Sequence, residues 1–429
     1  MTTSKRLAIP VILLVSLSLS GCFNTSQPAA NQAQHNMADM PGMSSSGGQE
    51  NTNSGTSDDM ASSAWVGTKN TTRINSSDPI QAAVLISQTL WMSTEESNRP
   101  GGVILTDISN WQTALVSSDL IHHPNNGPVL YVNAEGIPDA TLRELQRLNP
   151  KGVKDNQGTK VILVGDMNAE VAEQVKKLGF KTDIIPGGSP AAVAKAVDAY
   201  YTKSAGSNPM SVIIGSSDEA SKAYTLPAVN WISHMPEPLL YVSKDQIPAE
   251  TVEALKTREG KANIYILGPV DVISEQIAKE LASYGKVVRI GGSSPADNAI
   301  AFARYKDPAT DFGWGITTPG HNFSFISESI PLLALAAAPF SHLGKHAPML
   351  WTAQDKLPNS AMKYLMQVEP KYSISPVEGP YNHAWITGDM SSINRFVQGQ
   401  IDSALEITSA SGSGHDMSNM DNRSEMDHK

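Results

Sequence analysis

One short pattern occurs three times along this chain at a constant spacing. A proline followed by a short apolar strand, and then by a hydrophobic residue and a second proline, begins at Pro128, Pro238 and Pro348. Successive copies are therefore 110 residues apart. Self-similarity at a fixed period indicates one structural unit that is repeated in tandem. We expect three copies of a single unit rather than one large domain.

Two further apolar segments recur in the same order. Segments 161–165, 264–268 and 384–388 each precede a helical pattern, and segments 103–106, 212–215 and 314–317 lie upstream of the proline strands. Short apolar runs that alternate with amphipathic stretches are typical of a parallel sheet covered by helices on both faces. The sequence predicts an α/β fold of three tandem Rossmann-like parallel repeats of about 110 residues each. A pseudo-threefold unit and a linear array both fit this pattern.

Proline also marks the predicted helix starts, because its fixed φ and missing N–H are tolerated in the first turn. Pro138, Pro248 and Pro358 occupy such positions. Each following segment has an apolar face that we expect to cover the sheet, formed by Leu142, Leu145 and Leu148, by Val252 and Leu255, and by Met362, Leu365 and Met366.

These signals divide the chain into six segments. We expect a signal peptide at 1–21, a lipid anchor and disordered tether at 22–72, repeats at 73–180, 181–286 and 287–407, and a disordered tail at 408–429. The tether and the tail are polar and of low complexity, with few aliphatic side chains to bury.

The N-terminus has the features of an exported lipoprotein. Lys5 and Arg6 precede an apolar run at 7–19, which is shorter than the roughly 20 residues that span a membrane. The run ends in Leu19-Ser-Gly-Cys22, which resembles the bacterial lipobox. The resemblance implies cleavage before Cys22, the only cysteine, and its acylation by chains such as palmitate. We expect the protein on the extracytoplasmic face of the cell membrane, held there by lipid.

The body of the chain resembles the cell wall-binding repeat type 2 family, whose modules occur in tandem threes in surface proteins of Gram-positive bacteria. The opening turn of that family is matched by Arg73-Ile74, by 184–190 and most clearly by 289–295, and its proline-led strand occurs in all three copies. An Asp-Ala-Leu position of the family differs here, reading Thr113-Ala-Leu115 in the first copy. The resemblance implies three Rossmann-like modules in a trimer-like unit that attaches non-covalently to anionic wall polymer.

Two glycine-serine turns are candidate ligand sites. They comprise Gly187, Gly188 and Ser189 before one proline, and Gly291, Gly292, Ser293 and Ser294 before another. Ligands of parallel α/β sheets bind beyond the carboxyl ends of the strands, and amides at a helix N-terminus can hold an anion such as a polymer phosphate. An ordinary helix cap explains the same residues. The sequence leaves both interpretations open.

Charge and motifs exclude several classes of function. The formal net charge is −10 and becomes −12 once Lys5 and Arg6 are removed, which argues against nucleic acid as a partner. The chain has no Gly-x-Ser-x-Gly elbow, no Gly-x-Gly-x-x-Gly fingerprint, no P-loop and no His-Glu-x-x-His motif. We therefore expect a binding protein that is not an enzyme and needs no cofactor.

Methionine and histidine are concentrated in the two polar tails. The candidate metal ligands there are Met37, Met40, Met43, His415, Met417 and Met420. Thioether and imidazole groups suit Cu(I), and a flexible segment can fold around an ion. Drift in the composition of a disordered tail explains the same residues.

Histidines in the body give weaker signals. His342 and His346 have the spacing of two ligands on one helical face, but Gly344 lies between them and an acidic partner is missing. We expect either a loop or satisfied surface histidines. His122 and His123 precede Pro124 and are expected to begin a connection. Neighbouring positions in sequence are poorly placed to share one ion.

Together these features predict a lipid-anchored envelope protein that binds anionic cell-wall polymer non-covalently through its three repeats. Two alternatives remain. One is a solute-binding lipoprotein, which would have two lobes around one cleft. The other is a copper-binding envelope protein that uses its Met/His-rich tails while the repeats serve as a scaffold.

Overall fold

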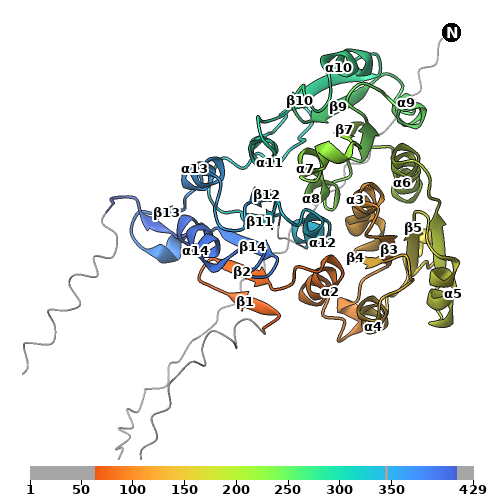
Figure 1. Ribbon diagram of the computed structural model, residues 1–429, viewed down its shortest axis with the longest axis horizontal. Coiled ribbons are helices and arrows are strands. Elements are labelled where there is room, and N and C mark those ends of the chain that lie inside the picture. Colours follow the sequence, from red (N-terminus) through yellow and green to blue (C-terminus); the bar gives the residue numbers. More distant parts are fainter. Residues whose placement is uncertain (1–62, 344–345, 413–429) are drawn as a thin grey trace, which may run out of the picture. The chain divides into compact units, whose positions relative to one another are not determined.

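The computed structural model describes residues 63–343 and 346–412, which belong to one compact unit (Figure 1). The expected signal peptide, Cys22, the tether up to residue 62 and the candidate copper ligands of both tails lie outside the described residues. Among the described helices, none is long and apolar enough to cross a membrane.

Two four-stranded sheets have the same topology. The strands of the first are β3 (Val103–Asp107), β4 (Val129–Val132), β5 (Val161–Val164) and β6 (Thr182–Ile185), and those of the second are β7 (Ser211–Ser216), β8 (Leu239–Val242), β9 (Ala262–Leu267) and β10 (Gly285–Ile290). All pairings are parallel, and the orders are β4-β3-β5-β6 and β8-β7-β9-β10. The predicted α/β class with parallel sheets is confirmed.

The third sheet is completed by the N-terminal end of the described chain. Its strands β11 (Asn322–Ser327), β12 (Met349–Thr352) and β14 (His383–Thr387) have the order β12-β11-β14. The next strand is β2 (Thr71–Ile74), which pairs in parallel with β14 and occupies the place of β6 and β10 in the other sheets. The edge strand β1 (Trp65–Gly67) is antiparallel to β2. The chain is thereby closed on itself.

Several sequence boundaries differ from this arrangement. Segment 314–317 is a loop rather than a strand, and the strand that matches β3 and β7 is β11, whose hydrophobic residues are buried. The division at 180 separates β6 from its own sheet, and the division at 286 falls within β10, because each of these strands pairs with the preceding copy.

The ends of the expected tether and tail are also ordered in the structure. Residues 63–72 include β1 and the start of β2, and Thr71 is fully buried. Strand β15 (Thr408–Ser409) pairs in parallel with β13 (Lys371–Tyr372). Strands β2 and β15 pair with strands more than 30 positions away, and β1 pairs with β2. Amino-acid composition does not reveal such pairing.

Three connecting helices lead from one sheet to the next. They are α2 (Pro79–Leu90), α6 (Pro190–Ala205) and α11 (Pro295–Arg304), each with proline at its first position. Helix α6, for example, follows β6 and then packs on β8 of the second sheet. Each module therefore depends on its neighbour for part of its helical cover.

The three modules meet through their inner helices. These are α3 (Trp111–Ser117), α8 (Ala228–Ile232) and α12 (Leu333–Ala337), and they contact one another pairwise at the centre of Figure 1. Every residue of α12 is buried. Of the two arrangements that the sequence left open, the structure has the closed unit of three modules rather than the linear array.

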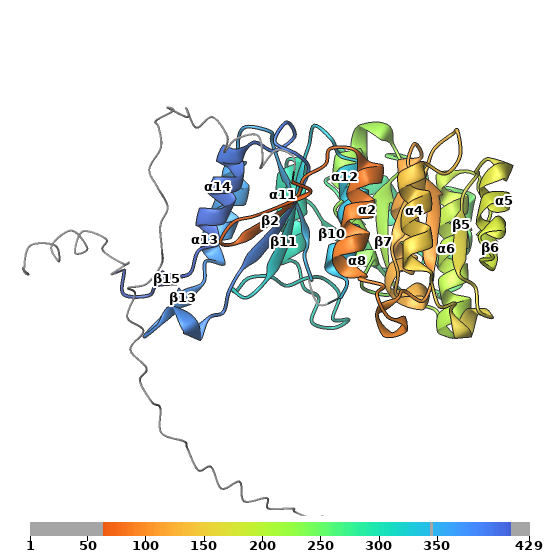
Figure 2. The same cartoon turned by 90° about the horizontal axis from the view of Figure 1, so that it is seen from below.

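Outer helices flank the sheets and run alongside their strands (Figure 2). They are α4 (Asp139–Leu148), α5 (Ala169–Lys177), α9 (Ala249–Lys256), α10 (Glu275–Leu281), α13 (Asn359–Gln367) and α14 (Arg395–Ala404), while the short α7 (Lys222–Thr225) precedes α8. Pro138, Pro248 and Pro358 are the N-cap residues of α4, α9 and α13. Leu145, Leu148, Leu255 and Leu365 are buried as expected. Met366 is 63% exposed, because it lies a third of a turn from Leu365 and faces a groove beside α14.

Candidate functional site

The two glycine-serine turns lie where helices begin. Residues 187–189 join β6 to α6, and residues 291–294 join β10 to α11. Ser189 Oγ accepts a hydrogen bond of 3.2 Å from the Ala192 amide, and Ser294 Oγ accepts one of 3.1 Å from the Asp297 amide. Both serines therefore act as N-caps.

Carboxylates already occupy the surroundings of these turns. A Cβ atom on Gly187 would lie 2.1 Å from Cγ of Asp166. In the other turn, Ser293 Oγ donates to Asp297 Oδ2 at 2.7 Å, and the Gly292 amide donates to Asn298 Oδ1 at 3.3 Å. A phosphate at either turn would meet a negative charge, so the cap explains the geometry better. Anion binding at these turns stays a prediction.

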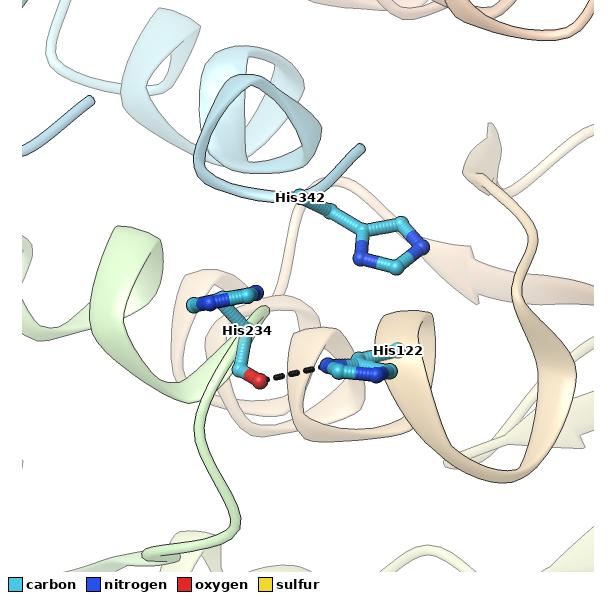
Figure 3. A group of neighbouring side chains, drawn as sticks. All are labelled: His122, His234 and His342. Carbon is cyan, nitrogen blue, oxygen red and sulfur yellow. Dashed lines mark hydrogen bonds between the residues drawn. The ribbon is translucent and has the colours of Figure 1, made fainter. Parts of the chain in front are cut away.

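A second constellation was not predicted from the sequence. His122, His234 and His342 come from three different modules and lie together beyond the C-terminal ends of the inner helices (Figure 3). His122 lies in the π-helical turn η3 (Ile121–Asn125), and His234 follows α8 by two residues. His342 directly follows the 3₁₀ turn η6 (Ala338–Ser341), which continues from α12. We call these three residues the histidine triad.

The triad is compact. One ring nitrogen of each histidine lies within 4.8 Å of the others. The ring of His122 stacks on that of His234 with centroids 5.3 Å apart, and its centroid is 4.7 Å from that of His342. His346 packs its ring edge-to-face against His234 at 4.2 Å. His342 is buried, His234 is half-buried and His122 is exposed, so the group has one side open to solvent.

Hydrogen bonds fix the protonated nitrogen of two of the rings. His122 Nδ1 lies 2.6 Å from the carbonyl oxygen of His234, which only accepts, so Nδ1 is the donor of this hydrogen bond. His342 Nε2 lies 2.8 Å from Asn126 Oδ1, and the same argument assigns the proton to Nε2. In the described part of the chain, Nδ1 of His342 and Nδ1 of His234 are buried without a hydrogen-bond partner.

Burial keeps two members of the triad neutral. It lowers the pKa of His234 to about 4, with smaller contributions from His346 and His122. It also lowers the pKa of His342 to about 4, to which His122, His234 and His346 add. Near neutral pH these two rings are uncharged imidazoles, which is the form that acts as a hydrogen-bond acceptor or a ligand.

His342 lies in a turn, as one of the two sequence interpretations predicted, but it is only 6% exposed and is not the surface residue of the other interpretation. A usable signal exists in the repeats. His122, His234 and His342 precede the recurring Pro128, Pro238 and Pro348 by six, four and six residues. Aligning the histidines to the repeat, instead of testing their spacing within one segment, identifies the triad.

Comparisons with known proteins report on the fold. No family model matches the chain, and no curated protein matches it. Among solved structures, Cwp6 from Clostridium difficile matches with a TM-score of 0.61 and 18% identity over 79% of this chain and 48% of its own. Cwp8 from Clostridium difficile matches with a TM-score of 0.59 and 15% identity over 79% of this chain and 52% of its own. The chain thus spans about half the length of two proteins whose fold it shares.

Proposed function

We propose that this chain is a lipid-anchored envelope protein that binds anionic cell-wall polymer non-covalently through its three modules and catalyses no reaction. The observation that carries the proposal is the closed unit of three α/β modules, a fold shared with Cwp6 and Cwp8, two cell wall proteins of C. difficile. Its lipobox-like segment ending at Cys22 supports membrane attachment, since an acylated cysteine and a polar tether would leave the modules free to reach the wall.

Charge limits how the polymer is held. With a net charge of −12 after removal of Lys5 and Arg6, the anchored protein repels a polyanion at long range. Attachment must therefore depend on local contacts that act at short distance, and we expect it to survive moderate salt better than capture by a basic surface would.

Sedimentation with isolated walls tests the proposal. The mature chain is expected to remain with untreated walls and to be released when anionic polymers are stripped from them. Equal retention on both kinds of wall, or retention on neither, would contradict the proposed function.

The glycine-serine turns can be tested in the same assay. Ser294→Ala removes the N-cap of α11. Ser274→Ala removes the N-cap of α10, where the Ser274 hydroxyl accepts from the Ile277 amide at 3.4 Å. Each substitution costs about 1 kcal/mol of stability, so the two variants should be equally destabilised. If the turn at 291–294 contacts polymer, only Ser294→Ala weakens retention. Equal retention of the two variants removes that turn from the binding surface.

The alternatives are separable from this function. A solute-binding lipoprotein would have two lobes around a cleft, whereas the described residues form three α/β modules that meet through α3, α8 and α12. Closure on a small solute would change the scattering profile, and its absence would reject this alternative. Copper binding by the tails predicts a lower copper stoichiometry after their deletion, and unchanged stoichiometry would reject it.

A further inference from the structure

We propose that the histidine triad binds one divalent transition-metal ion of borderline softness, of the class of Zn²⁺ or Co²⁺, with one imidazole supplied by each module. This site is separate from wall binding and from the candidate copper ligands of the tails. Imidazole nitrogen is a preferred ligand of such ions, and three histidines with one remaining position form a known type of four-coordinate site.

The distances suit a single ion after a small adjustment. Zn–N bonds of about 2.0–2.1 Å place tetrahedral ligands about 3.4 Å apart. The triad nitrogens lie within 4.8 Å of one another, so each ring needs to move inward by less than about 1 Å. His122 is exposed and can make most of this movement, while His342 is held by packing and by Asn126.

The outer hydrogen bonds follow the pattern of metal-binding histidines. Such histidines usually donate their second N–H to a carbonyl or carboxylate, which fixes the ring and directs the lone pair at the ion. His122 does so through Nδ1 to the carbonyl of His234, and His342 does so through Nε2 to the amide oxygen of Asn126. Two of the three rings are therefore oriented in advance by these hydrogen bonds.

Unpartnered nitrogens give a second, independent argument. Nδ1 of His342 and Nδ1 of His234 are buried, and neither has a hydrogen-bond partner among the described residues. A buried acceptor without a partner destabilises the folded state, so such groups call for an explanation. A bound cation would use the lone pair of His342 Nδ1, and that of His234 Nδ1 in the tautomer whose proton is on Nε2.

The site also has a structural consequence. Its three ligands follow α3, α8 and α12, the helices through which the modules contact one another. An ion at this position would cross-link all three modules near their common axis of contact. The exposed side at His122 leaves the fourth position for water.

Cobalt and zinc binding to the full mature chain tests the proposal. We expect one Co²⁺ per chain with the visible absorption bands of four-coordinate cobalt, displacement by Zn²⁺, and a rise in melting temperature that grows with Zn²⁺ concentration. His122→Gln, His234→Gln and His342→Gln should each weaken binding by at least about 100-fold, since outer-shell changes alone cost about 10- to 100-fold.

His123→Gln is the matched control. It removes a neighbouring imidazole that packs against Tyr201, 5.5 Å between centroids, and it leaves the triad and both tails intact. We expect wild-type affinity and wild-type cobalt bands. His122→Gln keeps the test decisive even where a buried variant fails to fold, because His122 is exposed. Unchanged cobalt bands in folded His122→Gln, or no binding by the folded wild type, would overturn the proposal.

Discussion

Arg73 Nη1 donates a hydrogen bond of 2.6 Å to the carbonyl oxygen of Gly388, which lies 315 residues further along the chain. Nε of the same guanidinium donates to Gln398 Oε1 at 3.0 Å. In the second module, Arg289 Nη1 makes the equivalent bond to the carbonyl of Gly268 at 3.1 Å. In both modules an arginine of the last strand, β2 or β10, therefore bonds to the glycine that follows the neighbouring strand, β14 or β9. In the third module, this contact closes the chain.

Removal of the Arg73 side chain should destabilise the protein strongly. The guanidinium is fully buried, and its burial lowers its pKa to about 10. Arg73→Ala leaves a cavity and unpartnered carbonyl groups, and we expect a loss of about 3–5 kcal/mol in the free energy of unfolding measured with urea. Arg289→Ala is the matched control, with an expected loss of about 1–2 kcal/mol, because that side chain is 20% exposed. Equal losses would contradict the role assigned to burial.

Truncation should show that β2 contributes strongly to the stability of the fold and that the residues before position 63 do not. A chain that begins at residue 63 keeps β1 and β2 and is expected to unfold at the same temperature as the full-length chain. A chain that begins at residue 75 lacks the fully buried Thr71, Arg73 and Ile74 and should lose more than about 4 kcal/mol of stability. Hydrogen exchange of the β14 amides would report the change directly, and full protection in the shorter chain would refute the closure.

Disruption of the buried ion pair between Arg258 and Asp198 should lower the free energy of unfolding more than disruption of an exposed pair on the same helices. Arg258 Nη1 and Nη2 each donate to Asp198 at 2.9 Å, which joins the end of α9 to α6. Asp198→Asn leaves a buried cation without its counter-charge and should cost about 3–5 kcal/mol. Glu253→Gln removes the exposed partner of Lys195 on the same pair of helices and should cost less than about 1 kcal/mol. Chemical denaturation of both variants would check the difference.

Stability should depend on pH through the histidine triad. The pKa values of His234 and His342 are lowered to about 4, whereas a histidine in the unfolded chain titrates near 6.5. The unfolded state therefore binds protons first, so the stability present above pH 6.5 is lost as the pH falls toward 4. Each ring contributes at most about 1.4 kcal/mol per pH unit, and half-buried His234 contributes less because solvent screens it. The titratable groups that face the two rings are His122 and His346, besides the rings themselves.

A variant measurement isolates this effect. Unfolding free energies of the wild type and of His234→Gln/His342→Gln, measured in chelator between pH 4 and 7, should show a flatter profile for the double variant. Parallel profiles would assign the acid sensitivity to other groups.

The repeats made much of the fold predictable. Strands β4, β8 and β12 lie within the three proline-led segments, because a buried parallel strand leaves a continuous apolar run in the sequence. Segment 314–317 was matched with strands of the other two copies because Trp314 and Ile316 are apolar, but the segment is a loop. The pairing of β2 with β14 was not expected, since hydrophobic periodicity identifies a strand but not its partner. The match between Arg73-Ile74 and Arg289-Ile290 was the available signal.

Prediction of the candidate site was poorer for a physical reason. The serine caps at Ser189 and Ser294 are local, and local sequence suffices to find them. The histidine triad is assembled from three modules, and its members are more than 100 residues apart. Only the closed packing of the inner helices brings them together.

The closing strand also determines how this protein would respond to mechanical load. In the proposed anchored state, tension enters at residue 63 and reaches β1 first, a three-residue strand at the sheet edge. The next restraints are Thr68, whose hydroxyl donates to Asp402 Oδ1, the ion pair of Lys69 with Glu406, and Asn70, whose backbone amide donates to Asp402 Oδ1 at 2.7 Å. The paired strand β2 follows. Release of residues 63–70 would add about 25 Å of extended chain while every module stays folded. Under tension, the segment that contains β1 would therefore detach and extend before any of the three modules unfolds.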